Sequence, residues 1–178
     1  MCKLLEGSTS KNVVEIGGDQ GASAAIDRGK GFKEKMTACG ITLLASQYAA
    51  GWDPTVGKSI MEAYLTKYPG QINGVFGHND ELAIAGIQAS KAAGLKPGEN
   101  IHFVGVDATA NGFKYLISGE LGADIECNPL LAPQVFKAAL DGLNGVTGTP
   151  KWVPSQESQF FASQGAAELQ KILDTRKY

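Results

Sequence analysis

Short apolar runs alternate with longer segments of helical periodicity along the chain. The runs of strand length are residues 12–16 (NVVEI), 41–45 (ITLLA), 72–76, 101–106 (IHFVGV), 121–126 and 158–162. The segments with helical spacing of apolar residues are 23–39, 53–68, 81–93, 110–117, 131–143 and 165–173. Strands that alternate with helices of this length predict an α/β fold built on a doubly wound parallel sheet.

Capping and turn residues mark the ends of these helices. Asp53 followed by Pro54 is typical of an N-cap with proline at the first helical position, and Ser23 and Asp80 are expected to cap two other helices. Glycines that follow the helical spacing are expected to end three helices, at Gly40, Gly94 and Gly119. The predicted inner faces are Ala25, Gly29, Phe32 and Met36 in the first helix, and Val56, Ile60 and Ala63 in the second.

Composition narrows the classes of protein that fit this fold. The 178 residues are 43% hydrophobic, enough for one well-packed α/β domain, and the net charge of −2 gives no basic surface for nucleic acid. No apolar run approaches the ~20 residues that span a bilayer, and the first residues lack the apolar stretch of a secretion signal. The three cysteines form no CxxC pair, so they support neither a zinc site nor a disulfide framework, although one long-range disulfide stays open.

Polar or aromatic side chains follow each of the first five predicted strands. In chain order they are Asp19 and Arg28, Trp52, Asn79, Asp107 and Asn128. Because the carboxyl ends of parallel strands share one edge of the sheet, these groups are expected to gather where α/β proteins bind ligands. Carboxylate, amide and guanidinium groups pair with vicinal hydroxyls, and an indole packs on the C–H face of a sugar ring. The set therefore predicts a sugar site.

Each of these residues also has a structural interpretation. Asp107 and Asn79 are good helix caps, and Arg28 in the first turns of a helix would alone be a solvated surface residue. Trp52 could act as a packing lid over its loop. The joint placement of the residues at one edge is what favours ligand binding.

Three segments carry a resemblance to a known family. SAAIDRGKGF at 23–32, VFGHNDELA at 75–83 and VGVDA at 104–108 resemble the C-terminal lobe of periplasmic sugar-binding proteins of the ribose/galactose type. IECNPLL at 125–131, with LKPG at 95–98, is most similar to the galactofuranose-binding branch. The resemblance implies a periplasmic protein with a two-lobed binding-protein fold. It would close on a monosaccharide and present it to the permease of an ABC importer.

The resemblance also implies roles for individual residues. Arg28, Asn79 and Asp107 would bind sugar hydroxyls, and Trp52 would form the aromatic wall. Ribose-type relatives have a glutamine where this chain has Cys127, which argues against plain ribose; another aldopentose or an aldohexose, the furanose form included, is expected. The neighbours Glu126 and Asn128 are both candidates, and which side chain at 126–128 points at the ligand stays open.

The family's N-terminal lobe has no counterpart in these residues. Residues 1–127 are expected to form the C-terminal sugar-binding lobe, 128–156 to cross toward the missing lobe, and 157–178 to return as a strand and helix. The apolar residues near 130–140 would then lack cover. These features predict a truncated fragment with weak or no sugar binding of its own, and a homodimer that could exchange its C-terminal segment.

Other classes of protein fit the residues less well. A regulator of the lac-repressor type shares this core but adds a helix-turn-helix, which is not visible here. The glycines at 17–21 depart from the GxGxxG pattern of dinucleotide-binding enzymes, and no acidic residue ends the second strand. No GxSxG motif occurs, His78 is expected in a solvated loop and His102 in a strand, so no catalytic residues, cofactor or metal ligands are predicted.

Overall fold

A single twisted sheet organises the chain. The structure is a computed structural model that describes residues 1–148 and 150–178, and within them six strands form one sheet in the order β2-β1-β3-β4-β5-β6. They are β1 Asn12–Gly17, β2 Thr42–Tyr48, β3 Gly74–Gly77, β4 His102–Asp107, β5 Ala123–Glu126 and β6 Gln159–Phe161. The first five are parallel and β6 is antiparallel to β5, so the predicted doubly wound fold is confirmed with one reversed edge strand.

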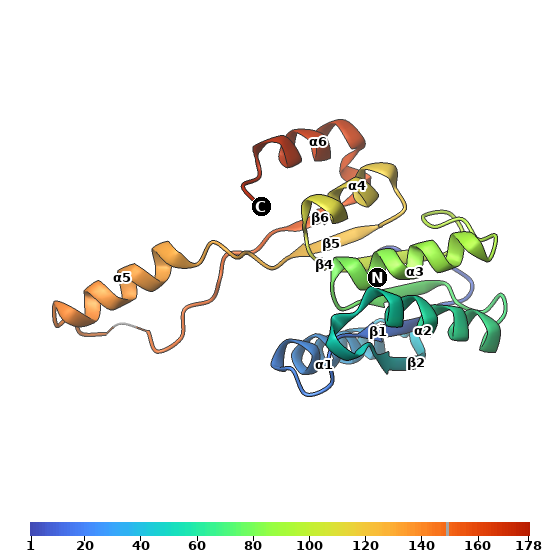
Figure 1. Ribbon diagram of the computed structural model, residues 1–178, viewed down its shortest axis with the longest axis horizontal. Helices are drawn as coiled ribbons and strands as arrows, with labels where there is room; N and C mark the ends of the chain where they lie inside the picture. The colour runs from blue at the N-terminus through green and yellow to red at the C-terminus, as the bar shows by residue number, and fades with distance from the viewer. Residues whose placement is uncertain (149) are drawn as a thin grey trace.

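Helices cover both faces of this sheet (Figure 1). The connections between strands contain α1 Ser23–Ala38, η1 Ala50–Trp52, α2 Pro54–Lys67, α3 Asp80–Ala92 and α4 Ala110–Ser118, and η2 Ala162–Gln164 and α6 Ala166–Thr175 follow the last strand. One core joins the apolar side chains of β1, β3 and β4 to those of α2, α3, α4 and α6. The second core joins the other face of the sheet to α1 and the N-terminal segment, through Phe32, Met36 and Leu5.

The N-terminal segment is also joined covalently to α1. Cys2 and Cys39 form a disulfide across a sequence separation of 37, with their Cα atoms 6.0 Å apart. The sequence left one long-range disulfide open without naming its cysteines. Cys127 is free and exposed.

Two details of the helices differ from the sequence prediction. The N-cap of α1 is Ala22 without a side-chain bond, and α3 is capped by Asn79, whose Oδ1 accepts from the N–H of Leu82. Asp80 cannot cap α3 because its carboxyl group is turned into the core. The predicted cap Asp53 and the helix end at Gly119, where φ is +80°, are confirmed.

The inner face of α2 is rotated from the predicted one. Its buried residues are Gly57, Ile60, Met61 and Tyr64, whereas Val56 and Ala63 are exposed. A Cβ at Gly57 would lie 2.7 Å from the side chain of Leu82, so glycine lets α2 and α3 approach closely. A buried glycine carries no apolar signal, which is why the face was misplaced.

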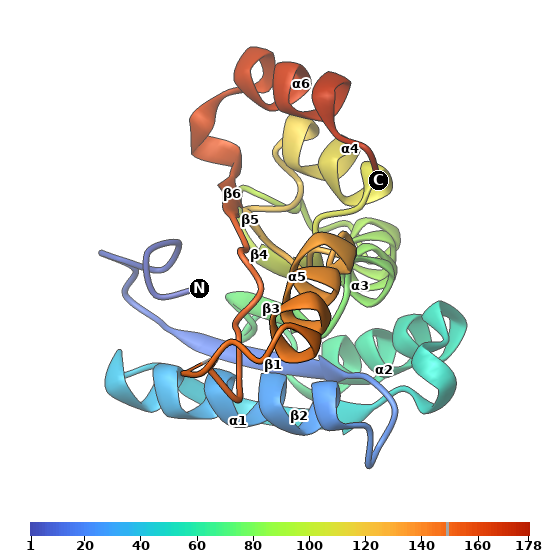
Figure 2. The same cartoon turned by 90° about the vertical axis from the view of Figure 1, so that its left-hand side faces the viewer.

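Residues 128–148 and 150–156, the arm, project from the carboxyl edge of the sheet (Figures 1 and 2). The arm holds α5 Ala132–Leu143, and a return segment then leads back to β6. No residue of α5 is buried. Its large exposed apolar residues include Leu130, Leu131, Val135, Phe136, Leu140, Leu143, Val146, Trp152 and Val153. The rest of the chain, the body, therefore makes its core without the arm.

Candidate functional site

Three of the predicted residues meet at the carboxyl edge of the sheet. Arg28 Nη2 donates to Asp107 Oδ1 at 3.2 Å, and the guanidinium lies 5.6 Å from the ring centroid of Trp52. Arg28 comes from α1, Trp52 from η1 and Asp107 from the end of β4, so three separate connections build one cluster. All three side chains are partly exposed, which leaves planar hydrogen-bonding groups and an aromatic ring open to a ligand.

The position of Trp52 is set by close packing against the loop after β1. A Cβ at Gly18 would lie 2.3 Å from ring atoms of Trp52, so the indole rests directly on glycine backbone. Trp52 has a φ of +58°, an uncommon value for a large residue. Asp19 stabilises this turn by accepting the N–H of Gly51 at 3.2 Å. The role of Asp19 in the structure is therefore to support the loop that carries Trp52.

Asn79 lies next to this cluster at the end of β3 and also serves as the N-cap of α3. Its Oδ1 accepts from the N–H of Leu82 at 2.9 Å. In the part of the chain that the structure describes, its amide N–H groups have no partner, so they can donate to a ligand hydroxyl. The capping interpretation and the binding interpretation of Asn79 are thus compatible.

A buried contact between His78 and Glu15 supports the cluster from behind. His78 is fully buried, its Nε2 lies 2.8 Å from Glu15 Oε1, and its backbone oxygen accepts from Arg28 Nη1. Burial favours the neutral acid, but hydrogen bonds from His78 and Ser46 lower the pKa of the Glu15 carboxyl. The expected solvated histidine is therefore wrong: the ring fills a space between Phe76 and Trp52 and pairs with a carboxylate. The charge inside the apolar run NVVEI was the overlooked signal.

Asp107 begins a turn that rests on two buried acids. Asp80 Oδ2 accepts from the backbone N–H and from the hydroxyl of Thr109, both at 2.7 Å, and Asp124 Oδ1 accepts from Ala108 N–H at 3.2 Å. Burial and the neighbouring charge of Asp80 raise the pKa of Asp124 to about 9. Burial also raises the pKa of Asp107, although Arg28 opposes that shift. Sequence reasoning missed Asp124, which lies between two apolar residues inside the short strand β5.

Glu126 lies beside Asp107 in the pairing of β4 with β5, but its side chain binds the C-terminal tail and the segment before β6. The Glu126 carboxylate accepts from Ser158 N–H at 2.9 Å, from Arg176 Nη1 at 2.9 Å and from the hydroxyl of Tyr178. Burial would favour its neutral form, but the hydrogen bonds from Tyr178, Ser158 and Arg176 lower the pKa of Glu126. This carboxylate fixes the C-terminal tail, and the expected ligand contact of Glu126 stays a prediction.

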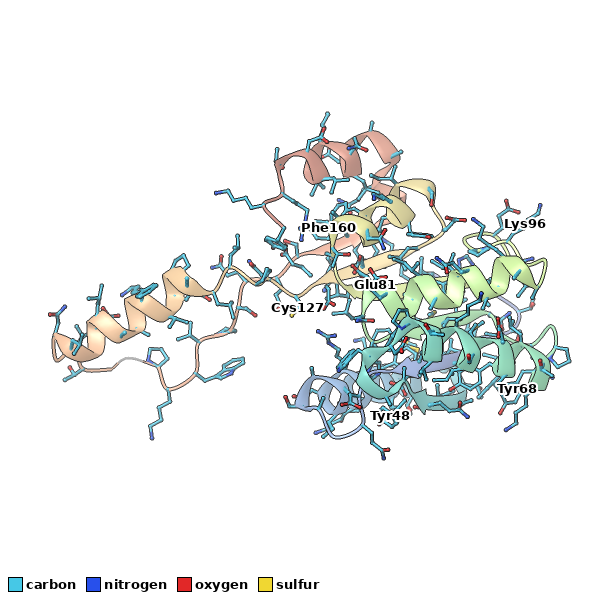
Figure 3. All side chains as sticks on the ribbon, viewed as in Figure 1. Tyr48, Tyr68, Glu81, Lys96, Cys127 and Phe160 are labelled. Atoms are coloured by element: carbon cyan, nitrogen blue, oxygen red, sulfur yellow. A yellow bond between two sulfur atoms is a disulfide. The ribbon has the colours of Figure 1, made fainter. Side chains whose placement is uncertain are left out.

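Asn128 has local partners of the same kind. Its Oδ1 accepts from Leu130 N–H at 2.8 Å and its Nδ2 donates to the backbone oxygen of Gln156 at 3.3 Å. It therefore holds together the two chain segments at the base of the arm. Cys127, between these residues, is labelled where β5 runs out toward the arm in Figure 3.

Within residues 1–148 and 150–178, no group of three or more His, Cys, Asp or Glu residues could hold a metal ion. None of the described helices is long and apolar enough to cross a bilayer.

Comparisons with known proteins agree with this architecture. Residues 1–145 match the family described as periplasmic binding protein domain. The galactofuranose-binding protein YtfQ of Escherichia coli (strain K12) is 34% identical over 166 residues, which are 90% of this chain and 51% of that protein. The chain thus spans about half the length of this curated relative.

Two solved structures extend the comparison. One is the periplasmic binding protein component of the arabinose ABC transporter from Shewanella sp. ANA-3, bound to α- and β-L-arabinofuranose. It has a TM-score of 0.85 and 31% identity, and the match covers 99% of this chain and 61% of that one. The other, a Mycobacterium smegmatis protein in complex with β-D-fucofuranose, has a TM-score of 0.78 and 32% identity over 97% of this chain and 59% of that one. With the family match over most of its length, the chain therefore belongs to the periplasmic binding protein family.

Proposed function

We propose that this chain recognises a monosaccharide in its furanose form, as part of the solute-binding component of an ABC sugar importer. The observation that carries the proposal is the Arg28–Asp107 pair beneath the indole of Trp52 at the carboxyl edge of the sheet. A furanose ligand is also supported by three similar proteins, whose names or titles state galactofuranose, arabinofuranose and fucofuranose. Nothing in the site calls for bond-making chemistry, so the proposed role is binding alone.

The chemistry of the three groups suits one sugar ring. Asp107 accepts two vicinal hydroxyls, Arg28 donates to ring or hydroxyl oxygens, and Trp52 packs on the apolar C–H face of the ring. Asn79 adds amide donors from the neighbouring strand. Because Arg28 and Asp107 already contact each other, a sugar would bind to a pair whose orientation is set before it arrives.

The ligand class can be tested with matched sugars. Methyl α-L-arabinofuranoside and methyl α-L-arabinopyranoside differ in ring form but not in composition, and methyl galactosides offer the same comparison for a hexose. Binding would be followed by the indole N–H resonances of Trp52 in the site and of Trp152 on the arm. We expect furanosides to shift the Trp52 signal and to leave Trp152 unchanged.

A variant pair tests the residues. Asp107→Asn should raise the dissociation constant at least tenfold, because a hydrogen bond to a charged group contributes about 1.5–3 kcal/mol. Glu62→Gln, an exposed substitution on α2, is the control and should leave it unchanged. Equal binding of pyranosides, or an Asp107→Asn variant with full affinity, would contradict the proposal.

We further propose that residues 1–127 and 157–178 form one sugar-binding lobe and that the arm belongs against another lobe. One wall of a site encloses a sugar incompletely, since closure needs two lobes that move together. We therefore expect dissociation constants in the millimolar range for the isolated chain.

The exposed apolar face of α5 also bears on association of the chain. Removing such a surface from water contributes about 25 cal/mol per Å², so we propose that two copies cover each other's arms as a homodimer. Light scattering should give twice the mass of one chain at micromolar concentration. Phe136→Glu should return a single-chain mass, and a wild-type protein that is already monomeric would end this idea.

A further inference from the structure

We propose that the buried acids Asp80 and Asp124, together with Arg176, are positioning residues that hold the turn 107–109 and thereby aim the Asp107 carboxylate at the ligand. This inference rests on the function proposed above for Asp107. The three residues themselves lie beneath or beside the turn, so they would act through Asp107.

The backbone of the turn is costly to maintain. Asp107 has a φ of +117° and Ala108 a φ of +56°, and both are residues with a Cβ in a region that favours glycine. Two such consecutive residues persist only where surrounding contacts over-determine the conformation, and such residues cluster at ligand-binding sites. The turn is therefore a place where positioning residues are needed.

Three elements supply those contacts. Asp124 of β5 accepts Ala108 N–H at 3.2 Å, and Asp80 at the start of α3 accepts both the N–H and the hydroxyl of Thr109 at 2.7 Å. From the C-terminal tail, Arg176 Nη2 donates to the backbone oxygen of Ala108 at 2.8 Å. Every polar backbone group of Ala108, and the N–H of Thr109, is thus bound by an ionisable side chain.

Arg176 is itself fixed in place. Its Nη1 contacts Glu126 at 2.9 Å, and its guanidinium lies 4.4–5.2 Å from the ring centroids of Tyr178, Phe113 and Phe160. Figure 3 labels Phe160 in this region, beneath α6. Since Glu126 also binds Ser158 at the base of the arm, the same arginine joins the arm's attachment to the binding turn.

The two acids are packed too closely for both to carry charge. Asp80 and Asp124 are 1% and 0% exposed, and a Cβ at Gly112 would lie 2.4 Å from an oxygen of Asp80 and 2.6 Å from one of Asp124. Asp80 Oδ1 and Asp124 Oδ2 are buried and have no other hydrogen-bond partner among the described residues, and one proton placed between the two carboxyl groups satisfies both atoms. With its pKa raised to about 9, Asp124 holds that proton at neutral pH and donates to the Asp80 carboxylate.

Other charges around the pair are few and identifiable. Asp107 and Glu81 add negative charge from β4 and α3, while Arg28 faces Asp107 from α1 and Arg176 faces the turn from the tail. When Asp124 ionises, it keeps its acceptor for Ala108 but loses the bond to Asp80. The repulsion between two buried carboxylates would then loosen the turn.

Conservative and disruptive substitutions of Asp124 test the proposal. Asp124→Asn keeps an acceptor for Ala108 and a donor for Asp80, whereas Asp124→Ala removes both. We expect furanoside affinity of Asp124→Asn to stay within twofold of wild type at pH 7, and that of Asp124→Ala to fall at least tenfold in protein shown to be folded by circular dichroism. Arg176→Met, compared with Lys171→Met on the exposed surface, gives a second test that leaves the acid pair intact.

A pH series adds a readout that a purely structural role would not move. Wild-type affinity should fall as pH passes about 9, because Asp124 ionises there, and Asp124→Asn should show no such fall. Unchanged affinity in both Asp124→Ala and Arg176→Met, with folded protein, would overturn the proposal.

Failure of the proposed function can be told apart from failure of the positioning role proposed for Asp80, Asp124 and Arg176. Amide resonances and hydrogen exchange of Ala108 and Thr109 report the turn without any sugar. If no furanoside binds any variant, the ligand role falls with the proposed function. The proposal that the acids hold the turn then stands if Asp124→Ala accelerates hydrogen exchange at Ala108 and Thr109. It falls if exchange at these two residues is unchanged.

Discussion

The body and the arm contain helices of similar length whose apolar residues have opposite environments. In the body, α3 has nine buried residues and packs against the sheet beside α2, whereas α5 in the arm buries none. Phe103 in β4 is 0% exposed and Phe136 in α5 is 68% exposed. Apolar periodicity therefore predicts that a helix has an inner face, but not that the same chain covers it.

The largest expected effect is a difference in the free energy of unfolding between substitutions at two phenylalanines. Phe103→Ala opens a cavity in the first core, so we expect it to lower the free energy of unfolding by about 3–5 kcal/mol. Phe136→Ala removes an exposed ring and should change the value by less than about 0.5 kcal/mol at concentrations where the chain is monomeric. Chemical denaturation of both variants measures the difference. A similar loss for both would mean that the arm is packed in solution.

A second prediction concerns the disulfide of the body. Replacing Cys2 and Cys39 together with serine removes a cross-link over a separation of 37 residues, which should cost about 2–4 kcal/mol of unfolding free energy. Hydrogen exchange should accelerate in α1 and the N-terminal segment and stay constant in α5. Cys127→Ser is the control, because that thiol is free and exposed. Equal denaturation midpoints for the double variant and wild type would contradict the prediction.

The third comparison sets a buried acid of the body, Asp124, against a partly exposed acid of the arm, Asp141. Between the unfolded pKa near 4 and the folded pKa of about 9, folded Asp124 holds a proton that the unfolded chain has released. Its stabilisation is complete below the unfolded pKa and is lost as pH rises toward 9. The unfolding free energy of Asp124→Asn relative to wild type should therefore rise by about 1.4 kcal/mol per pH unit, for example between pH 6 and 7.

Asp141→Asn is the matched change on the arm. Asp141 pairs with Lys137 one turn away on the surface of α5, and such exposed pairs contribute about 0.3–0.5 kcal/mol. We expect no slope with pH between 6 and 9 for this variant relative to wild type. A flat difference for Asp124→Asn as well would mean that Asp124 is ionised in the folded protein.

The sequence predicted the exposed residues of the site better than the buried residues that support them. Arg28, Trp52 and Asp107 were expected at one edge because parallel strands end together, and the structure brings them into contact. Glu15 and Asp124 were not anticipated as supports, because each lies between two apolar residues of a strand and its partners come from elements far away in sequence. Residue patterns report the period of an element, but the pairing of buried charges depends on how distant elements meet.

Residues 126–128 show a second limit of sequence reasoning. Their position after β5 is the same as that of Asp107 after β4, which made Glu126 and Asn128 reasonable ligand candidates. The structure shows that they also fix the C-terminal tail and the base of the arm, and their contact with a ligand stays a prediction. The partner Arg176 lies 50 residues away in the chain, so no local pattern could reveal this use.

The antiparallel pairing of β5 with β6 has a consequence for how the chain folds. Ile125 lies opposite Gln159, so the whole arm must be accommodated in a loop before the last strand can join the sheet. The entropy lost on closing a flexible loop grows with the logarithm of its length, and halving the loop would save about 0.6 kcal/mol. If this closure limits the rate, a chain with half the arm should refold about threefold faster, and the edge strand would be the last part of the sheet to form.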